Sequence, residues 1–457
     1  MDWLSILPPL IAISMVLWKK DVIMALLVAV LSAEFLLILN TSEASFLLTP
    51  INTIERIVST ASSAGNARIL IFSLLVGAFL AFIRDSGGVT ALVNRLVNSG
   101  MASSKKRTGA ITMFTGIAVF IESNLSVLAA GIMARGLYDK FKMSRARLAY
   151  VIDSTSAPVC ILILVNGWGA YILGLLSAYE LEQNALKMLW SSVPYNLYAI
   201  LTIAVVGYTI FADKVHGPLK KAEQELEKID TEIAITKATK SRYMTIPLAV
   251  MIFGTLFFMW WTGNGDFTSG SGSKSVLYAT FLACFVGYIM LLISGKESVQ
   301  SATKIGFNGM SELLPLVTIV LLSITLGASL KQLGTGLFVA GIVGEHLAAF
   351  LILPALFIAG GIISFTTGTS WGTFAILIPI GMPLVQTLEL PPEIVLAAIL
   401  GGGIFGDHCS PISDTTAISS LAAGCDLLTH VKTQLPYALG VGLATILGYT
   451  LMGVFLL

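Results

Sequence analysis

The feature that most constrains this chain is the polar run at residues 401–416, which reads Gly-Gly-Gly-Ile-Phe-Gly-Asp-His-Cys-Ser-Pro-Ile-Ser-Asp-Thr-Thr. Apolar residues continue on both sides, so the segment 394–424 is long enough to cross a membrane. Each ionised side chain near the bilayer centre costs about 3 kcal/mol or more, so carboxylates at this depth indicate a functional site. Gly406, Pro411 and the hydroxyl groups predict an interrupted helix, which is tolerated there only where it lines a buried cavity.

The composition excludes a soluble globular protein. Of 457 residues, 56% are hydrophobic and 12% are charged, whereas a soluble domain carries about 25% charged residues. The chain is therefore predicted to be an all-α polytopic membrane protein. A net charge of +1 without a long basic tract gives no indication of a nucleic-acid partner. The four cysteines lie in apolar surroundings, where free cysteine behaves as a small hydrophobic residue, so no disulfide framework is expected.

Apolar stretches of about 20 residues predict about ten transmembrane helices. They lie at residues 3–18, 22–40, 67–84, 148–178, 188–212, 244–262, 275–294, 312–330, 394–424 and 435–456. The first of them is expected to remain as a helix, since no basic region or cleavage site marks a signal peptide.

Two further apolar stretches are predicted to enter the membrane and return as re-entrant hairpins, at residues 108–134 and 351–384. Basic residues flank the first hairpin on both sides, which places both of its ends in the cytoplasm. The second has acidic flanks without nearby Lys or Arg and is expected to enter from outside. Counting from the basic loop at 213–242 places both termini outside the cytoplasm.

A weak internal repeat supports this arrangement. Residues 116–120 precede the first polar tip as residues 361–365 precede the second, and residues 153–156 follow the first hairpin as residues 413–416 follow the second. These matches predict two inverted repeats, an architecture in which sites lie at the midplane between discontinuous helices. The alternative is that two apolar sequences share short matches by chance. The repeats are predicted at 1–212, with a broken helix at 148–178, and at 244–457, with a broken helix at 394–424, joined by a cytoplasmic linker at 213–243.

The two hairpin tips and the two helix breaks are predicted to converge on one site rich in oxygen atoms, the ligands that hard cations such as Na⁺ prefer. The predicted ion-binding and coupling residues are Asp153, Asp407, Asp414, Ser154, Thr155, Ser410, Ser413, Thr415 and Thr416, with Na⁺ at the three aspartates. The predicted substrate-binding residues are Glu122, Ser123, Asn124, Thr366, Thr367, Thr369, Ser370 and His408.

Buried carboxylates of this kind predict obligatory exchange. A proton and a cation compete for one carboxylate because either neutralises it, and a bare buried carboxylate is too costly to move across the membrane. Two alternatives stay open at this point. Each aspartate can instead cap a half-helix, and Glu122 can pair with Arg135 or face a cytoplasmic vestibule.

Other functions fit the sequence less well. The cluster Asp407-His408-Cys409 lacks the ligand spacings of a zinc site. The glycines at 401–406 match a dinucleotide-binding pattern, but no strand precedes them, and close helix packing explains them better. A channel would need a charged ring or a carbonyl filter, and an enzyme would have only His408 beside Cys409 or Ser410 as base and nucleophile.

Four motifs resemble the NhaC family of Na⁺/H⁺ antiporters within the ion-transporter superfamily. They are residues 406–416, residues 365–373 (Phe-Thr-Thr-Gly-Thr-Ser-Trp-Gly-Thr), residues 153–158 (Asp-Ser-Thr-Ser-Ala-Pro) and residues 433–437 (Thr-Gln-Leu-Pro-Tyr). The resemblance implies exchange of Na⁺ for H⁺ in a bacterial inner membrane, with Na⁺ as the transported ion and no cofactor. The wider superfamily implies a homodimer whose hairpin-bearing domain moves against a scaffold.

The resemblance leaves a second function open. Relatives in this family include exchangers of organic acids such as malate and lactate, and amino-acid carriers, so Na⁺- or H⁺-coupled transport of a small organic solute is the alternative. Glu122-Ser123-Asn124 resembles the Ser-Asn-Thr motif of dicarboxylate carriers in the superfamily, but Leu125 replaces the threonine. That departure argues against a dicarboxylate site.

Overall fold

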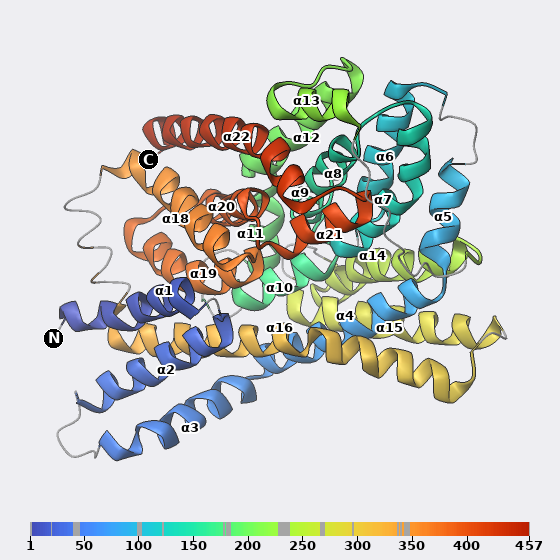
Figure 1. Cartoon of the computed structure of the whole chain (residues 1–457). Helices are drawn as coiled ribbons and strands as arrows, with labels where there is room; N and C mark the ends of the chain where they lie inside the picture. Colours follow the sequence, from blue (N-terminus) through green and yellow to red (C-terminus); the bar gives the residue numbers. More distant parts are fainter. Residues whose placement is uncertain are drawn as a thin grey trace.

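The computed structural model of the chain describes residues 2–19, 21–39, 46–97, 103–120, 123–176, 179, 184–226, 238–265, 270–294, 297–335, 338, 341 and 348–456. These residues are mostly helical, and none of them forms a strand. The all-α fold class is therefore confirmed. In the view of Figure 1 the helices form two groups, a lower layer of mainly long helices and an upper layer that contains the interrupted ones.

The lower layer in Figure 1 brings together helices from the first and second halves of the chain. Its members are α2 (Val22–Leu39), α3 (Thr49–Ser62), α4 (Ala64–Asp85), α14 (Arg242–Thr262), α15 (Gly272–Ile293) and α16 (Val299–Leu333). Two shorter helices adjoin it, α1 (Leu7–Lys19) against α2 and α5 (Gly88–Val97) after α4. Short 3₁₀ turns precede α1 and α3, at Asp2–Ile6 and Phe46–Leu48.

The upper layer contains both predicted hairpins and both predicted breaks. From the first half it takes α6 (Lys105–Ala118), α7 (Ser123–Lys140), α8 (Arg145–Ser154), α9 (Ala157–Cys160), α10 (Gly167–Leu176), α11 (Ala185–Ser191), α12 (Leu197–Phe211) and α13 (Gly217–Glu225). From the second half it takes α18 (Ile352–Thr367), α19 (Ser370–Leu388), α20 (Pro392–Cys409), α21 (Asp414–Ala423) and α22 (Leu427–Leu456). Two 3₁₀ turns, Val193–Tyr195 and Ala349–Leu351, lead into α12 and α18.

Eight helices of the described chain are long and apolar enough to cross a membrane, or nine if α11 and α12, bent by 43°, form one span. Six of the eight coincide with predicted spans, and the other two are the arms of the second hairpin. Those arms were expected to form a re-entrant hairpin that enters from outside, whereas each is long enough to cross. The predicted first span is a shorter helix of 13 residues, and the predicted span 435–456 begins earlier, at Leu427. Polar residues at 427–434 lower the hydropathy of that stretch, but backbone hydrogen bonds continue α22 through it.

A buried ion pair ties the lower layer together. Glu34 of α2 is 3% exposed and its carboxylate lies 2.8 Å from the guanidinium of Arg56 on α3. The same oxygen accepts a hydrogen bond from the Ser329 hydroxyl of α16 at 2.7 Å. These partners explain how an acidic residue is tolerated inside an apolar helix. Between the layers, the Ser323 hydroxyl of α16 donates to the Ala375 carbonyl of α19 at 2.6 Å.

Glycines let the second hairpin lie directly on the second broken helix. A Cβ atom added at Gly406 of α20 would overlap the carbonyl oxygen of Gly361 on α18, and one added at Gly402 would overlap the carbonyl oxygen of Phe357. The two backbones are therefore in contact, as small residues permit between membrane helices. Close helix packing therefore explains the glycine run, and a dinucleotide-binding role is not needed to explain it.

Candidate functional site

The tip of the second hairpin docks on the break between α20 and α21. Gly368 closes α18 with a φ of +70°, which glycine adopts at no steric cost, and so turns the chain into α19. The Ser410 hydroxyl in the break donates to the carbonyl of Phe365 at 2.7 Å. From the tip, the Ser370 hydroxyl donates to Oδ2 of Asp407 at 3.0 Å. Hairpin and broken helix are thus joined through the carboxylate of Asp407.

The break itself is built from hydroxyl side chains. Ser413 caps α21, its oxygen accepting from the backbone N–H of Thr416, and it lies 3.0 Å from the Thr415 hydroxyl. The Thr416 hydroxyl reaches back across the break to the carbonyl of Asp407 at 3.3 Å. Asp414 is the first residue of α21, and its side chain lies outside the described residues. The helix cap at this break is therefore made by Ser413.

The first hairpin docks on the first broken helix in a similar way. A Cβ added at Gly116 of α6 would lie 2.6 Å from the Thr155 hydroxyl, at the end of α8. The carbonyl of Phe120, at the tip, accepts a hydrogen bond from the Asn166 amide at 3.0 Å. Ser123 begins α7 and is 2% exposed. Glu122 lies outside the described residues.

Of the two site aspartates whose side chains the structure describes, Asp153 is the more enclosed. It lies in the last turn of α8, before the break, and is 0% exposed. Its Oδ2 accepts a hydrogen bond from the Gln434 amide nitrogen at 2.7 Å and lies 3.3 Å from Nε2 of His430. Its Oδ1 is buried and has no hydrogen-bond partner within the described chain. An oxygen in this condition can accept a proton or ligate a cation.

Helix α22 links Asp153 to the second broken helix. The Gln434 amide nitrogen that holds Asp153 also donates to the carbonyl of His408, on α20, at 3.0 Å. His408 is 1% exposed, and its Nδ1 lies 3.1 Å from the Tyr198 hydroxyl of α12. The residue beside His408 is Asp407. The two broken helices, distant in sequence, are therefore joined through one amide group on a third helix.

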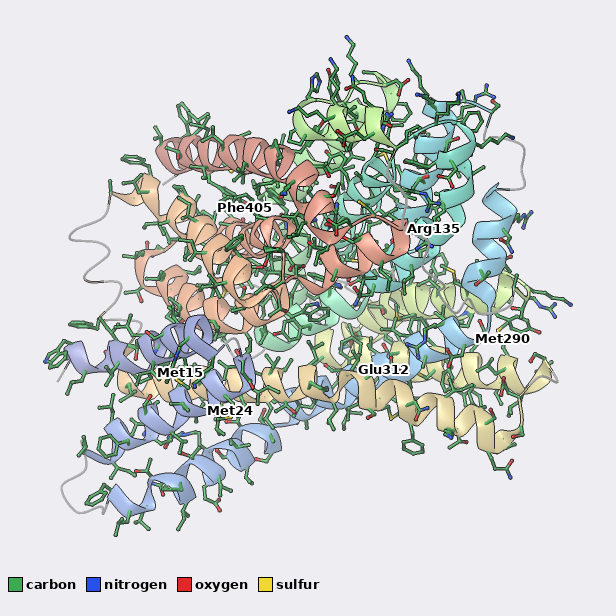
Figure 2. The ribbon with its side chains drawn as sticks, in the orientation of Figure 1. Met15, Met24, Arg135, Met290, Glu312 and Phe405 are labelled. Atoms are coloured by element: carbon green, nitrogen blue, oxygen red, sulfur yellow. The ribbon has the colours of Figure 1, made fainter. Side chains whose placement is uncertain are left out.

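Two arginines hold the far end of α21 against the first hairpin. Arg135 of α7 donates to the carbonyls of Leu421 and Ala422, and Figure 2 labels it where α7 approaches α21. Arg145 of α8 donates to the Ala423 carbonyl at 2.7 Å and forms two hydrogen bonds with the Asp139 carboxylate. Cations at a helix C-terminus are favourable because the last carbonyls carry partial negative charge. This clamp fixes α21 relative to α7 and α8.

The structure places only part of the predicted site around the carboxylates. The Ser370 hydroxyl contacts the Asp407 carboxylate, and the Thr416 hydroxyl contacts the Asp407 carbonyl. The Ser410 hydroxyl contacts the hairpin tip. The main-chain carbonyl of His408 is linked to Asp153 through the Gln434 amide. Other predicted hydroxyls turn back to carbonyls of their own helix and so gain a local partner. They are those of Thr155, bonded to Val151, of Thr366, bonded to Ile362, and of Thr367, bonded to Ile363. Ser154 is 1% exposed at the end of α8, Asn124 follows Ser123 in α7, and Thr369 precedes α19.

The predicted site did not include His430, Gln434 or Tyr198, although Gln434 lies in the family motif at residues 433–437. His430 and Gln434 are four residues apart and so share one face of α22. The available signal was a polar pair at this spacing next to a long apolar span, in a chain with only four histidines. Tyr198 had no such signal, since its role depends on where α12 packs.

The donor set fits a hard cation better than a transition metal. In the part of the chain that the structure describes, no group of three or more His, Cys, Asp or Glu side chains is placed to hold a metal ion. Asp407 bonds Ser370, whereas His408 bonds Tyr198. Carboxylate, hydroxyl and carbonyl oxygens are what the two breaks offer.

Comparisons with known proteins give a consistent picture. A family model described as the Na⁺/H⁺ antiporter family matches residues 159–454. An uncharacterised protein of Haemophilus influenzae is 29% identical over 98% of this chain and 90% of its own length. The malate-2H⁺/Na⁺-lactate antiporter of Bacillus subtilis is 31% identical over 38% of this chain and 37% of its own. The crystal structure of the Alcanivorax borkumensis YdaH transporter matches with a TM-score of 0.62 at 11% identity, over 91% of this chain and 90% of its own, and so shares the fold.

Proposed function

Because the chain belongs to the Na⁺/H⁺ antiporter family, and is therefore a multi-pass secondary transporter, we propose that it exchanges Na⁺ for H⁺ by alternating access at a midplane site. The observation that carries this proposal is Asp153, a wholly buried carboxylate of one interrupted helix that Gln434 of α22 links to the other. A buried carboxylate is costly unless neutralised. Obligatory exchange requires a site that crosses the membrane only when a cation or a proton occupies it.

In this proposal Asp153 and Asp407 bind and release the exchanged ions, with Asp414 as the third carboxylate. At the second break, hydroxyl oxygens complete the set of cation ligands. They belong to Ser370 and Thr416, which contact Asp407, and to Ser410, which contacts the second hairpin. The carbonyls at the end of α20 add partial negative charge. Na⁺ and H⁺ alternate on the carboxylates because each neutralises the same group.

The test is transport by the purified protein in proteoliposomes. An imposed Na⁺ gradient should move protons in the opposite direction, without any organic solute, and Asp153→Asn should abolish this movement while the variant still inserts. If a Na⁺ gradient moves no protons until a solute is added, simple antiport is wrong.

The second candidate is coupled transport of a small organic solute. It is favoured by the 31% identity to a malate-2H⁺/Na⁺-lactate antiporter over part of the chain. The solute would lie between the hairpin tips, with Ser370 and His408 among its contacts. Adding malate, lactate or an amino acid to the same proteoliposomes discriminates the two, because only solute transport makes the ion fluxes depend on the solute.

The proposal extends to the assembly. The hairpin and broken helix in each half support two inverted repeats at 1–212 and 244–457, with the linker at 213–243. We further propose a homodimer in a bacterial inner membrane, as the resemblance implies, with both termini outside the cytoplasm, as the basic loops predict. Cross-linking in membranes and the accessibility of terminal tags test these points.

A further inference from the structure

The amide of Gln434 stands between oxygens of both broken helices. Its nitrogen donates to Oδ2 of Asp153 at 2.7 Å and to the main-chain carbonyl of His408 at 3.0 Å. Gln434 is 1% exposed, so water does not compete freely for these bonds. One NH₂ group thus satisfies two acceptors that come from different halves of the chain.

The orientation of this amide is fixed by its partners. Both neighbours are acceptors, so the nitrogen must face them, because the oxygen end has no hydrogen to donate. The amide oxygen therefore points elsewhere, and it is buried without a hydrogen-bond partner in the described chain, as is Oδ1 of Asp153. Unpaired buried oxygens of this kind call for a ligand or another state in which they are satisfied.

The nitrogen occupies a place that suits a small cation. The two acceptor oxygens lie 2.7 and 3.0 Å from it, and bonds from oxygen to Ca²⁺, an ion of nearly the same radius as Na⁺, are about 2.3–2.6 Å long. An ion at the position of the nitrogen would need both oxygens to approach by only a few tenths of an ångström. Rotating the amide by half a turn exchanges its nitrogen and its oxygen, so the side chain must also withdraw by about 2.3–2.6 Å, one ion–oxygen distance, for that oxygen to face the ion.

Building on the proposed function, we propose that Gln434 is a further Na⁺ ligand that works by a flip of its amide. The NH₂ group bridges Asp153 and His408 and occupies the place of the ion, so the proposal assigns this bridge to the cation-free state. When Na⁺ enters, the Gln434 side chain withdraws and its amide turns, the ion takes the place that the nitrogen held, and the oxygens of Asp153, His408 and Gln434 bind it together. The amide thereby supplies a donor when the site is empty and an acceptor when the site is filled.

Equilibrium binding of ²²Na⁺ to the purified full-length protein, with two substitutions at this position, tests the flip. Gln434→Leu removes both donor and acceptor and should weaken Na⁺ binding about 10–100-fold, the usual effect of losing a partner at a metal site. Gln434→Glu keeps an oxygen but loses the amide donor, so it should bind Na⁺ at least as tightly as the wild type and exchange it more slowly. The matched control is Thr445→Val on the same helix, whose buried hydroxyl bonds only its own helix at 2.9 Å.

The outcomes separate the inference from the function. If Gln434 only holds the helices together, Leu and Glu should impair Na⁺ binding equally, and that result overturns the inference, as does wild-type affinity in the Leu variant. If the wild type shows no saturable Na⁺ binding, or Asp153→Asn leaves it unchanged, the proposed function is overturned and the flip with it. Should a variant not fold, Na⁺-induced infrared difference spectra of the wild type decide, since the flip requires a shifted side-chain amide carbonyl band.

Discussion

The contact between α18 and α20 leads to a sharp prediction for Gly406→Ala. The added methyl group would overlap the carbonyl oxygen of Gly361 and lie 2.7 Å from both the Phe365 nitrogen and the Ser364 Cβ. Two of these three neighbours are backbone atoms, which cannot rotate away as the end of a side chain can. The two helices must therefore separate.

The size of the effect follows from the distances. Ordinary contacts of a Cβ atom are 3.4–4 Å long, so the backbones must part by about 1 Å, and such overpacking typically costs about 1–3 kcal/mol. The same movement stretches the bond between Ser370 and Asp407 from 3.0 Å toward about 4 Å, beyond hydrogen-bonding distance. We expect both lower stability and loss of transport, because Asp407 follows Gly406 directly.

Thermal unfolding of the purified protein and Na⁺-driven proton flux in proteoliposomes measure these two effects. Gly440→Ala on α22 is the matched control, since beyond the adjoining backbone of its own helix no described atom lies within 4 Å of its added Cβ. Alanine favours a helix over glycine by about 1 kcal/mol, so the control should be as stable as the wild type or slightly more. A Gly406→Ala protein with wild-type stability and flux, or a control that is equally damaged, would refute the backbone-contact argument.

Three further substitutions test the site. Asp153→Asn should abolish exchange without unfolding the protein, because asparagine keeps the size but carries neither ion, and wild-type flux would remove Asp153 from the coupling role. Ser370→Ala deletes a hydrogen bond to a buried carboxylate, worth about 1.5–3 kcal/mol, so the apparent Na⁺ affinity in flux assays should change about tenfold or more; an unchanged affinity would show that this bond does not tune the site. Arg145→Ala leaves the Asp139 carboxylate and the Ala423 carbonyl without a donor that they now have and should lower the melting temperature, whereas a variant as stable as the wild type would contradict the clamp.

Local sequence signals were sufficient where the physics is local. Pro411 and the surrounding hydroxyls predicted the interruption of the second broken helix, and the structure has it between Cys409 and Asp414. The turn at Gly368 and the polar tip beside it likewise marked the second hairpin. The sequence matched residues 153–156 with residues 413–416, but the two aspartates of this match lie on opposite sides of their breaks. Asp153 lies in the last turn before its break, and Asp407 does so in the second half, whereas Asp414 begins the helix after the break.

Hydropathy fixed the class of this protein from the sequence, because burying an uncharged helix in lipid depends on composition alone. It also located the carboxylates whose cost in a membrane requires a purpose. Which groups hold those carboxylates was decided only by tertiary structure. Gln434 and His430 meet Asp153 across about 280 residues of chain, and no spacing rule reaches that far, since it is the packing of α22 between the broken helices that brings them together.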